Sequence, residues 1–223
     1  MKKSVYSIVL MDDVVQAIDA LAYRLGTSRS NLINQILAEK VALITPEMQM
    51  RNVFNEVEKL LDGYSHFQIQ PQAADSMMSI RSVLRYKYNP TIRYAITLDR
   101  SAGSRIGELK VISRTQSDVL QKYLVHFFEL WTMQEKQVKL PGWQIDQGGK
   151  WMRELIKQDD RICEGEQIAS AIADYIKAVD KGIKIYFQYI DNIPYLNREL
   201  SNHFNTYIPV SYTHLTLPTN SRV

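Results

Sequence analysis

The residues with the clearest chemical potential are four cations that lie close together in the middle of the sequence. Tyrosines are interleaved with them, and cations beside aromatic rings are a common way of holding an anion, a nucleotide or a DNA backbone. Arg81 and Arg85 are four residues apart, which would place both on one face of a helix. The plainer interpretation, which we favour, is a solvated face whose tyrosines pack into the core. The candidate anion site consists of Arg81, Arg85, Lys87 and Arg93, with Tyr86, Tyr88 and Tyr94 between them.

The residues that bind metals or act as nucleophiles are few and far apart. His66, His126, Cys163 and His203 occur singly, without the spacing of a metal site. The sequence also has no phosphate-binding glycine loop, no Gly-x-Ser-x-Gly motif and no His-Glu-x-x-His motif. We therefore expect no metal site, no cofactor and no enzymatic activity.

The composition indicates a globular chain of one large or two small domains. Of its 223 residues, 45% are hydrophobic and 23% are charged, with a formal net charge of +3. The single cysteine excludes an internal disulfide and favours a reducing compartment. No apolar run is long enough to cross a membrane, and the N-terminus does not have the pattern of a signal peptide. We therefore expect a cytoplasmic protein with no membrane partner.

The first 44 residues combine a short apolar strand with two amphipathic helices. Residues 4–11 (SVYSIVLM) have the composition of a strand, and residues 12–25 have apolar side chains at helical spacing. Gly26 ends this first helix, and Ser28 can cap a second helix that runs to about residue 44. A single apolar strand cannot be buried by two helices of its own chain, so the pattern predicts a second copy.

This order of elements resembles the ribbon-helix-helix family of DNA-binding proteins, the Arc/MetJ/CopG superfamily. The resemblance covers residues 1–44 and rests on the strand, the helix spacing, the Gly26 turn and the sequence Ser28-Arg29-Ser30. In that family, strands from two subunits pair antiparallel and enter the major groove. The resemblance therefore implies a homodimer or higher oligomer that binds double-stranded DNA.

The resemblance also assigns roles to individual residues. Alternate strand residues face the bases, the start of the second helix contacts phosphates, and two N-terminal lysines can add contacts from an arm. The base-facing residues are Val5, Ser7 and Val9; the phosphate contacts are Ser28, Arg29, Ser30, Lys2 and Lys3; the dimer core is Tyr6, Ile8, Leu10, Ile18, Leu21, Leu32, Ile33 and Ile36.

The groove face departs from the family pattern. The family often has Arg, Lys, Thr, Gln or Asn there, whereas this chain has Val5 and Val9, and only Ser7 can form hydrogen bonds. Valine can contact a thymine methyl group, but it cannot make the bidentate base contacts that are worth about 1–3 kcal/mol each. Three interpretations remain open: weak sequence readout, additional contacts from Lys2 and Lys3, and a unit that serves only to dimerise.

The rest of the chain completes an α+β protein. Residues 1–45 form the DNA-binding and dimerisation unit, residues 46–63 a connecting helix that begins at Thr45-Pro46-Glu47, and residues 64–209 a mixed, mainly helical domain of unknown role. We expect a small antiparallel sheet there, because strand-helix-strand-strand-helix resembles a ferredoxin-like order. The predicted strands are 67–70, 91–98, 107–114 and one within 137–145; the predicted helices are 73–86, 117–136, 150–158, 164–189 and 194–207.

The end of the sequence has an unusual composition. Residues 210–219 (VSYTHLTLPT) resemble the in-frame translation of a sequencing adapter. We therefore expect residues 210–223 to be a non-native tail, expect the native sequence to diverge after about Pro209, and assign no role to His214.

The leading functional interpretation is a transcriptional regulator. One alternative is an antitoxin, or a plasmid or mobile-element accessory protein, whose C-terminal region binds a protein partner. The other is a dimerisation module without specific DNA binding.

Overall fold

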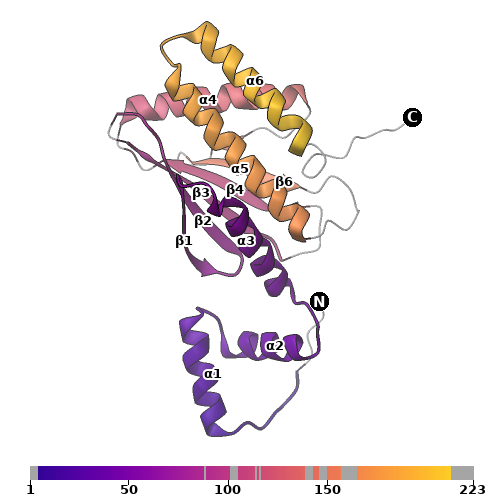
Figure 1. Ribbon diagram of the computed structural model, residues 1–223. Helices are drawn as coiled ribbons and strands as arrows, with labels where there is room; N and C mark the ends of the chain where they lie inside the picture. The colour runs from indigo at the N-terminus through magenta and orange to yellow at the C-terminus, as the bar shows by residue number, and fades with distance from the viewer. Residues whose placement is uncertain are drawn as a thin grey trace, which may run out of the picture.

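The computed structural model describes residues 5–87, 89–100, 105–113, 115, 117–138, 143–145, 150–156 and 165–211, except for the side chains of residues 72, 73 and 208–211. The described residues form six helices and a six-stranded sheet (Figure 1), which confirms the predicted α+β class. The elements are α1 (Asp12–Arg24), α2 (Arg29–Lys40), α3 (Pro46–Asp62), β1 (Phe67–Ala74), β2 (Met77–Val83), β3 (Thr91–Leu98), β4 (Arg105–Ser113), α4 (Asp118–Gln137), β5 (Gln144–Ile145), β6 (Trp151–Ile156), α5 (Gly165–Gln188) and α6 (Ile193–Ser211).

The sheet is entirely antiparallel, with the strand order β1-β2-β3-β4-β6-β5. One of its faces is buried and the other is more open, as is common for antiparallel sheets. The alternation is clearest in the central strand β3, where Ile92, Tyr94, Ile96 and Leu98 are buried and Thr91, Arg93, Ala95 and Thr97 are only half-buried.

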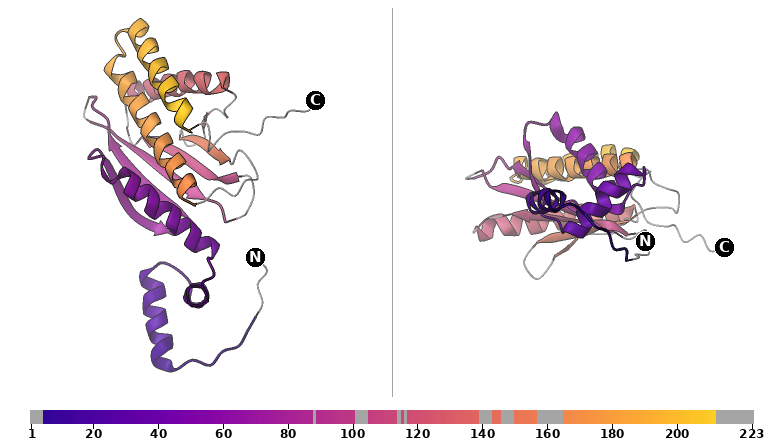
Figure 2. Two further views of the ribbon diagram at one scale, coloured as in Figure 1. Left: turned by 45° about the vertical axis from the view of Figure 1, so that its right-hand side comes forward. Right: turned by 90° about the horizontal axis from the view of Figure 1, so that it is seen from below.

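Helices α3, α4 and α5 cover the buried face of the sheet. Tyr94 of β3 contacts Asp180 of α5, and Arg153 of β6 contacts Glu135 of α4, so both helices lie on that face. Figure 2 shows α3 and α5 side by side across the sheet, with α6 packed on α5. The core is therefore a single layer of side chains between the sheet and these helices.

The predicted helix over residues 73–86 is wrong. This segment contains the end of β1, a turn at Asp75-Ser76, and β2, which pairs with both β1 and β3. Buried and exposed residues alternate along β2, which is the period of a strand. The apolar residues of this short segment also fit helical spacing, so pairing with strands on both sides decides the outcome.

The predicted helix over residues 150–158 is also wrong. Residues 151–156 form β6, which pairs with β4 along its length. Of the strand predicted within 137–145, the described residues contain β5, and residues 139–142 lie outside the described part of the chain. The sheet of this domain is therefore larger than the small ferredoxin-like sheet that the sequence predicts. A ferredoxin-like order requires a helix between the first two strands, whereas β1 and β2 form a hairpin here.

The N-terminal unit contains both predicted helices but not the predicted strand. Helices α1 and α2 lie apart from the sheet and are joined to it through α3 (Figure 1). Residues 5–11 have no strand partner and are not a β-strand in this single chain. The physical reason is that a strand needs a neighbouring strand to satisfy its backbone groups, and the described residues offer none at this position.

Helix α3 does more than connect the two parts. Phe54 and Val57 of α3 are completely buried in the core of the sheet domain, so the helix belongs to that core. Arg51 donates hydrogen bonds of 3.1 Å to both carboxylate oxygens of Asp75 in the β1–β2 turn, and a bond of 3.2 Å to Gln35 of α2. This arginine therefore links the N-terminal unit to the sheet. Within the part of the chain that the structure describes, no helix is long and apolar enough to span a membrane.

Candidate functional site

The start of α2, where the sequence predicts a phosphate contact, is a capped helix N-terminus. The Ser28 hydroxyl accepts a hydrogen bond of 3.2 Å from the backbone N–H of Asn31, which confirms Ser28 as the cap of α2. Thr27 fixes the same turn, because its hydroxyl accepts a bond of 3.0 Å from the Asn31 side chain. The remaining N–H groups of the first turn and the positive end of the helix dipole favour an anion at this position.

Arg29 is already engaged by an acidic residue. Its guanidinium group forms a bidentate ion pair with the Asp19 carboxylate of α1, and both side chains are largely exposed. The hydrogen bond and the charge of Asp19 raise the pKa of Arg29. The pair holds α1 against α2. It also neutralises the charge of Arg29, the residue that the resemblance assigns to phosphate contact. Ser30 is exposed on the same turn, and Lys2 and Lys3 lie outside the described residues.

The segment before α1 exposes almost all of its apolar surface. Val5 and Val9, the residues predicted to face the bases, are fully exposed, and Ser7 between them is exposed as well. Among the residues predicted to face the dimer core, Tyr6 is 86%, Ile8 58% and Leu10 37% exposed. The inward-predicted residues are thus the less exposed set, but none of them is buried.

The two helices leave a similar surface uncovered. Leu32 is buried, Ile18, Leu21 and Ile33 are half-buried, and Ile36 is exposed. The apolar surface continues beyond Ile36 through exposed residues at the end of α2 and in the segment that follows it, namely Leu37, Val41, Leu43 and Ile44. Half of the predicted dimer core is therefore exposed to solvent in the single chain, and only Leu32 is buried.

The four cations of the predicted anion site are not brought together. Arg81 of β2 and Arg93 of β3 are directly paired in the sheet and lie on its open face. Arg85 follows β2 and lies beside α5, and Lys87 is exposed in the next turn. The prediction fails because it placed Arg81 and Arg85 on one helix, whereas the segment is a strand that ends at Val83.

The tyrosines beside those cations are part of the core. Tyr94 is completely buried, and Tyr86 packs edge-on against Tyr123 and in a tilted arrangement against Phe187. Tyr88 lies outside the described residues. The interpretation of packed tyrosines is therefore confirmed for Tyr86 and Tyr94.

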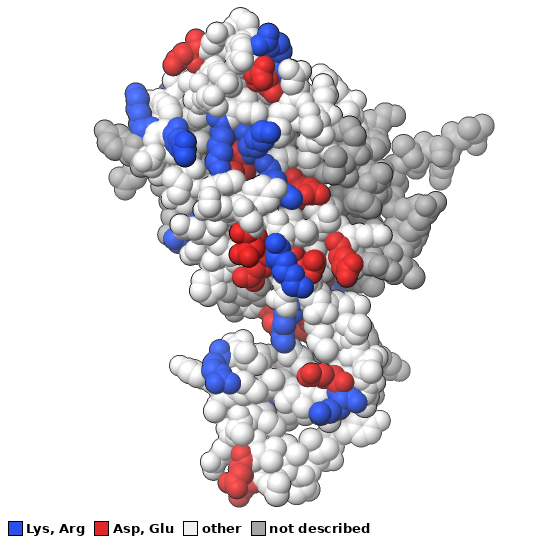
Figure 3. All heavy atoms as spheres, in the orientation of Figure 1, with Lys and Arg blue, Asp and Glu red and all other residues white. Residues whose placement is uncertain are grey.

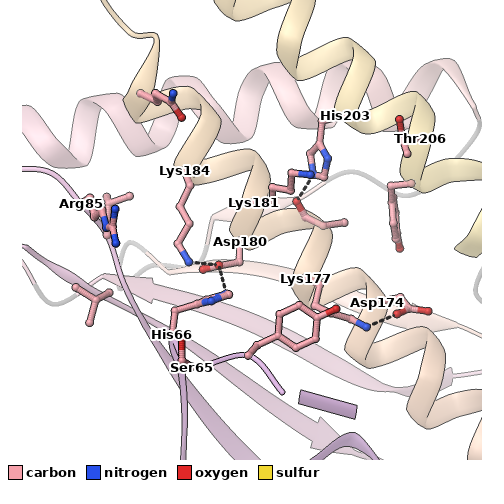
Figure 4. Close-up of a pocket in the computed structure, with 16 residues that line it drawn as sticks. Ser65, His66, Arg85, Asp174, Lys177, Asp180, Lys181, Lys184, His203 and Thr206 are labelled. Carbon is pink, nitrogen blue, oxygen red and sulfur yellow. Dashed lines mark hydrogen bonds and ion pairs between the residues drawn. The ribbon is translucent and has the colours of Figure 1, made fainter. Parts of the chain in front are cut away.

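A different cationic site lies over α5. A groove of 1120 Å³ is bounded by residues 64–66, the end of β2, the outer face of α5 and the C-terminal half of α6 (Figure 4). Figure 3 shows Lys and Arg side chains gathered on this part of the surface, with acidic side chains between them. The charged residues that line the groove are Arg85, Lys177, Lys181, Lys184, Asp174 and Asp180.

Both acidic residues of the groove already form ion pairs with lysines of α5. The Asp180 carboxylate, which is almost completely buried, accepts a bond of 2.6 Å from Lys184, and its Oδ2 lies 3.4 Å from Nε2 of His66. Asp174 pairs with Lys177 at 2.6 Å. Lys181 and Arg85 have no acidic partner among the residues that the structure describes. The groove therefore has four cations against two carboxylates, an excess of two positive charges.

Two histidines complete the groove without adding charge at neutral pH. Burial lowers the pKa of His66, and the charge of Lys184 lowers it further, against the opposing effect of Asp180. Burial also lowers the pKa of His203, whose Nε2 lies 2.8 Å from the Ala178 carbonyl oxygen and donates to it. Both side chains are therefore neutral hydrogen-bonding groups at pH 7.

Sequence reasoning missed this groove, although α5 carries a signal for it. Lys177, Lys181 and Lys184 are spaced by four and three residues, which places them on one face of a helix. Arg85 and His66 come from distant parts of the chain, and only the fold brings them to that face. The described residues contain no group of three His, Cys, Asp or Glu side chains that could hold a metal ion, and Cys163 lies outside them.

Comparison of the chain with protein-family models, with curated proteins and with solved structures found no match.

Proposed function

We propose that the chain is a homodimeric DNA-binding protein of the ribbon-helix-helix type, and that it acts as a transcriptional regulator. The observation that carries this proposal is the exposed apolar surface of residues 5–11 and of α2, next to a well-formed cap at the start of α2. We place this function in the cytoplasm, a reducing compartment that fits a chain with a single cysteine.

A second copy of residues 5–11 is the partner that this surface requires. Exposed apolar surface of this extent is unfavourable in water and marks an interaction site. Pairing two extended segments antiparallel would satisfy their backbone groups and bury alternate side chains. Ile8 and Leu10 are less exposed than Val5 and Val9, which supports the assignment of Ile8 and Leu10 to the side of the strand that faces the helices.

DNA contact is proposed at the start of α2 of both subunits and along the outer face of the paired segments. The cap leaves the first N–H groups of α2 available to a phosphate oxygen. Val5 and Val9 would face the bases and offer apolar contacts only, so we expect weak discrimination among sequences.

A dimerisation module without specific DNA binding is the second candidate. The ion pair between Arg29 and Asp19 favours it, because the arginine proposed to contact phosphate already has a partner. The valines on the outer face favour it as well.

Two substitutions at neighbouring positions test the pairing. In a paired strand, Ile8 points into the dimer and Val9 points out of it, so Ile8→Asp should yield a monomer in sedimentation equilibrium while Val9→Asp stays dimeric. For the dimeric Val9→Asp variant, a weaker affinity for duplex DNA than that of the wild type supports the DNA-binding reading, and an unchanged affinity supports the dimerisation module. A wild-type chain that is monomeric at micromolar concentration contradicts both candidates.

A further inference from the structure

We propose that the groove over α5 is a binding site for a phosphorylated small molecule. The groove belongs to the sheet domain and shares no residue with the N-terminal unit, so this inference does not depend on DNA binding.

The arrangement of charge favours a multivalent anion. Lys177 and Lys184, with Lys181 between them on one helix face, are separated by seven helical rises, which is about 10 Å along the axis. Arg85 enters from the opposite side of the groove, at the end of β2, beyond Lys184 (Figure 4). Phosphate groups match this arrangement, because ammonium and guanidinium groups are their usual partners in proteins.

The buried carboxylate of Asp180 fixes the position of Lys184, and the groove keeps its excess of two positive charges. Its Oδ1 accepts a hydrogen bond from the Tyr94 hydroxyl, and its Oδ2 accepts one from Lys184. Because Asp180 is fixed from beneath, the Lys184 side chain is held at the floor of the groove. Lys181 is exposed on the same face of α5 and lies close enough to His203 for its charge to lower the pKa of that histidine, so it remains available to a ligand.

The other end of the groove carries two neutral side chains beside Lys181. His203 and Thr206 of α6 lie there, near the ion pair of Lys177 with Asp174 (Figure 4). Neutral histidine and threonine side chains can bind hydroxyl or ring-nitrogen groups. The groove thus offers cations to the phosphates of a ligand and neutral groups to its organic part.

The size and place of the groove favour a small molecule over a nucleic acid. Its volume of 1120 Å³ lies just above the range of about 300–1,000 Å³ that is usual for small-molecule sites. The parts of α5 and α6 that line it are at the end of the sheet domain that points away from α1 and α2 (Figure 1). A duplex held by the N-terminal unit would therefore not lie over it.

Isothermal titration calorimetry of the full chain tests the proposal with three probes: inorganic pyrophosphate, ATP and succinate. We expect pyrophosphate and ATP to bind at one site per chain, with ATP tighter because its organic part reaches the neutral end. Lys181→Gln and Arg85→Gln should each weaken both by about tenfold, the effect of losing one charge-assisted hydrogen bond. Lys136→Gln, which removes an exposed lysine of α4 outside the groove, should change neither affinity.

Three results would overturn the proposal. The first is the absence of binding by both pyrophosphate and ATP. The second is binding that persists unchanged in Lys181→Gln and Arg85→Gln, both of which alter exposed side chains and whose folding is checked by circular dichroism. The third is succinate binding as tightly as pyrophosphate, which would show a general anion site. An ATP affinity equal to that of pyrophosphate would overturn the assignment of the neutral end.

Discussion

The Tyr94 hydroxyl, in the middle of the sheet, donates a hydrogen bond of 3.0 Å to the Asp180 carboxylate of α5. Both side chains are buried, and burial raises the pKa of Tyr94, with the Asp180 charge and the hydrogen bond acting in the same direction. Tyr94 therefore keeps its proton at neutral pH. This contact joins the sheet to the floor of the groove, because the same carboxylate holds Lys184.

Removing the Tyr94 hydroxyl should destabilise the fold. Tyr94→Phe leaves a buried carboxylate oxygen without its donor, which costs about 1–3 kcal/mol of unfolding free energy. Urea denaturation measures this, with Tyr23→Phe as the control, since Tyr23 is 91% exposed on α1. If both variants unfold at the wild-type midpoint, the hydrogen bond makes no contribution to stability.

The buried pair of Arg153 and Glu135 should be sensitive to the loss of one partner. The Glu135 carboxylate accepts from the Tyr175 hydroxyl at 2.5 Å and from the Trp131 indole N–H at 3.0 Å, besides its ion pair with Arg153. Burial raises the pKa of Glu135, and these partners, which favour the carboxylate, oppose that rise.

Arg153→Met should therefore cost about 3–5 kcal/mol of unfolding free energy, because it leaves a buried carboxylate without its cation. Combining it with Glu135→Leu should recover a substantial part of that loss, since no unpaired charge then remains. Arg198→Met, which breaks an exposed pair with Glu199, should cost less than about 1 kcal/mol. A double variant as unstable as Arg153→Met alone would refute this explanation.

Two glycines should respond oppositely to a methyl group. A Cβ at Gly107 would lie 2.0 Å from the Thr97 carbonyl oxygen, where the register of β4 against β6 shifts. A Cβ at Gly63 would meet nothing within 4 Å, and its φ of −70° suits alanine. We expect Gly107→Ala to lower the thermal unfolding midpoint strongly. Gly63→Ala should leave it unchanged or raise stability by up to about 1 kcal/mol. Equal midpoints for the two variants would contradict the close approach at Gly107.

Acidification should destabilise the protein through His203. Its pKa in the folded state lies below the value of about 6.5 for an unfolded chain. The unfolded state therefore binds the proton more readily, so this contribution to stability is complete above pH 6.5 and is lost as the pH falls below it. His203→Gln, which can still donate to the Ala178 carbonyl, should reduce the loss of stability between pH 7 and pH 5.5. An identical pH dependence in wild type and variant would exclude His203 as a source.

The sequence predicts the helices well because their signals are local. Thr45-Pro46 is a predicted helix start, and the Thr45 hydroxyl accepts the hydrogen bond of a cap from the backbone N–H of Met48. Most helix positions follow from apolar spacing, and α3, α4, α5 and α6 lie close to their predicted ranges.

The strands β2 and β6 could not be predicted in the same way. The segments 77–83 and 151–156 are short, with seven and six residues, and the spacing of their apolar side chains also fits a helix. Strand β2 depends on pairing with β3, which follows it in the chain, and β6 depends on pairing with β4, which is distant in the sequence. The groove was missed for a related reason, since Arg85 and Lys181 are almost a hundred residues apart.

The salt dependence of duplex DNA binding tests the central claim most directly. It compares full-length wild type with Arg29→Ala and Asp19→Ala, which both break the same ion pair, and with Lys181→Gln in the groove. We predict that Arg29→Ala lowers the slope of log K against log salt by about one for each arginine that contacts phosphate, whereas Asp19→Ala and Lys181→Gln do not lower it. A wild-type chain that binds no duplex at low salt, or a slope unchanged by Arg29→Ala, would contradict DNA binding by the N-terminal unit.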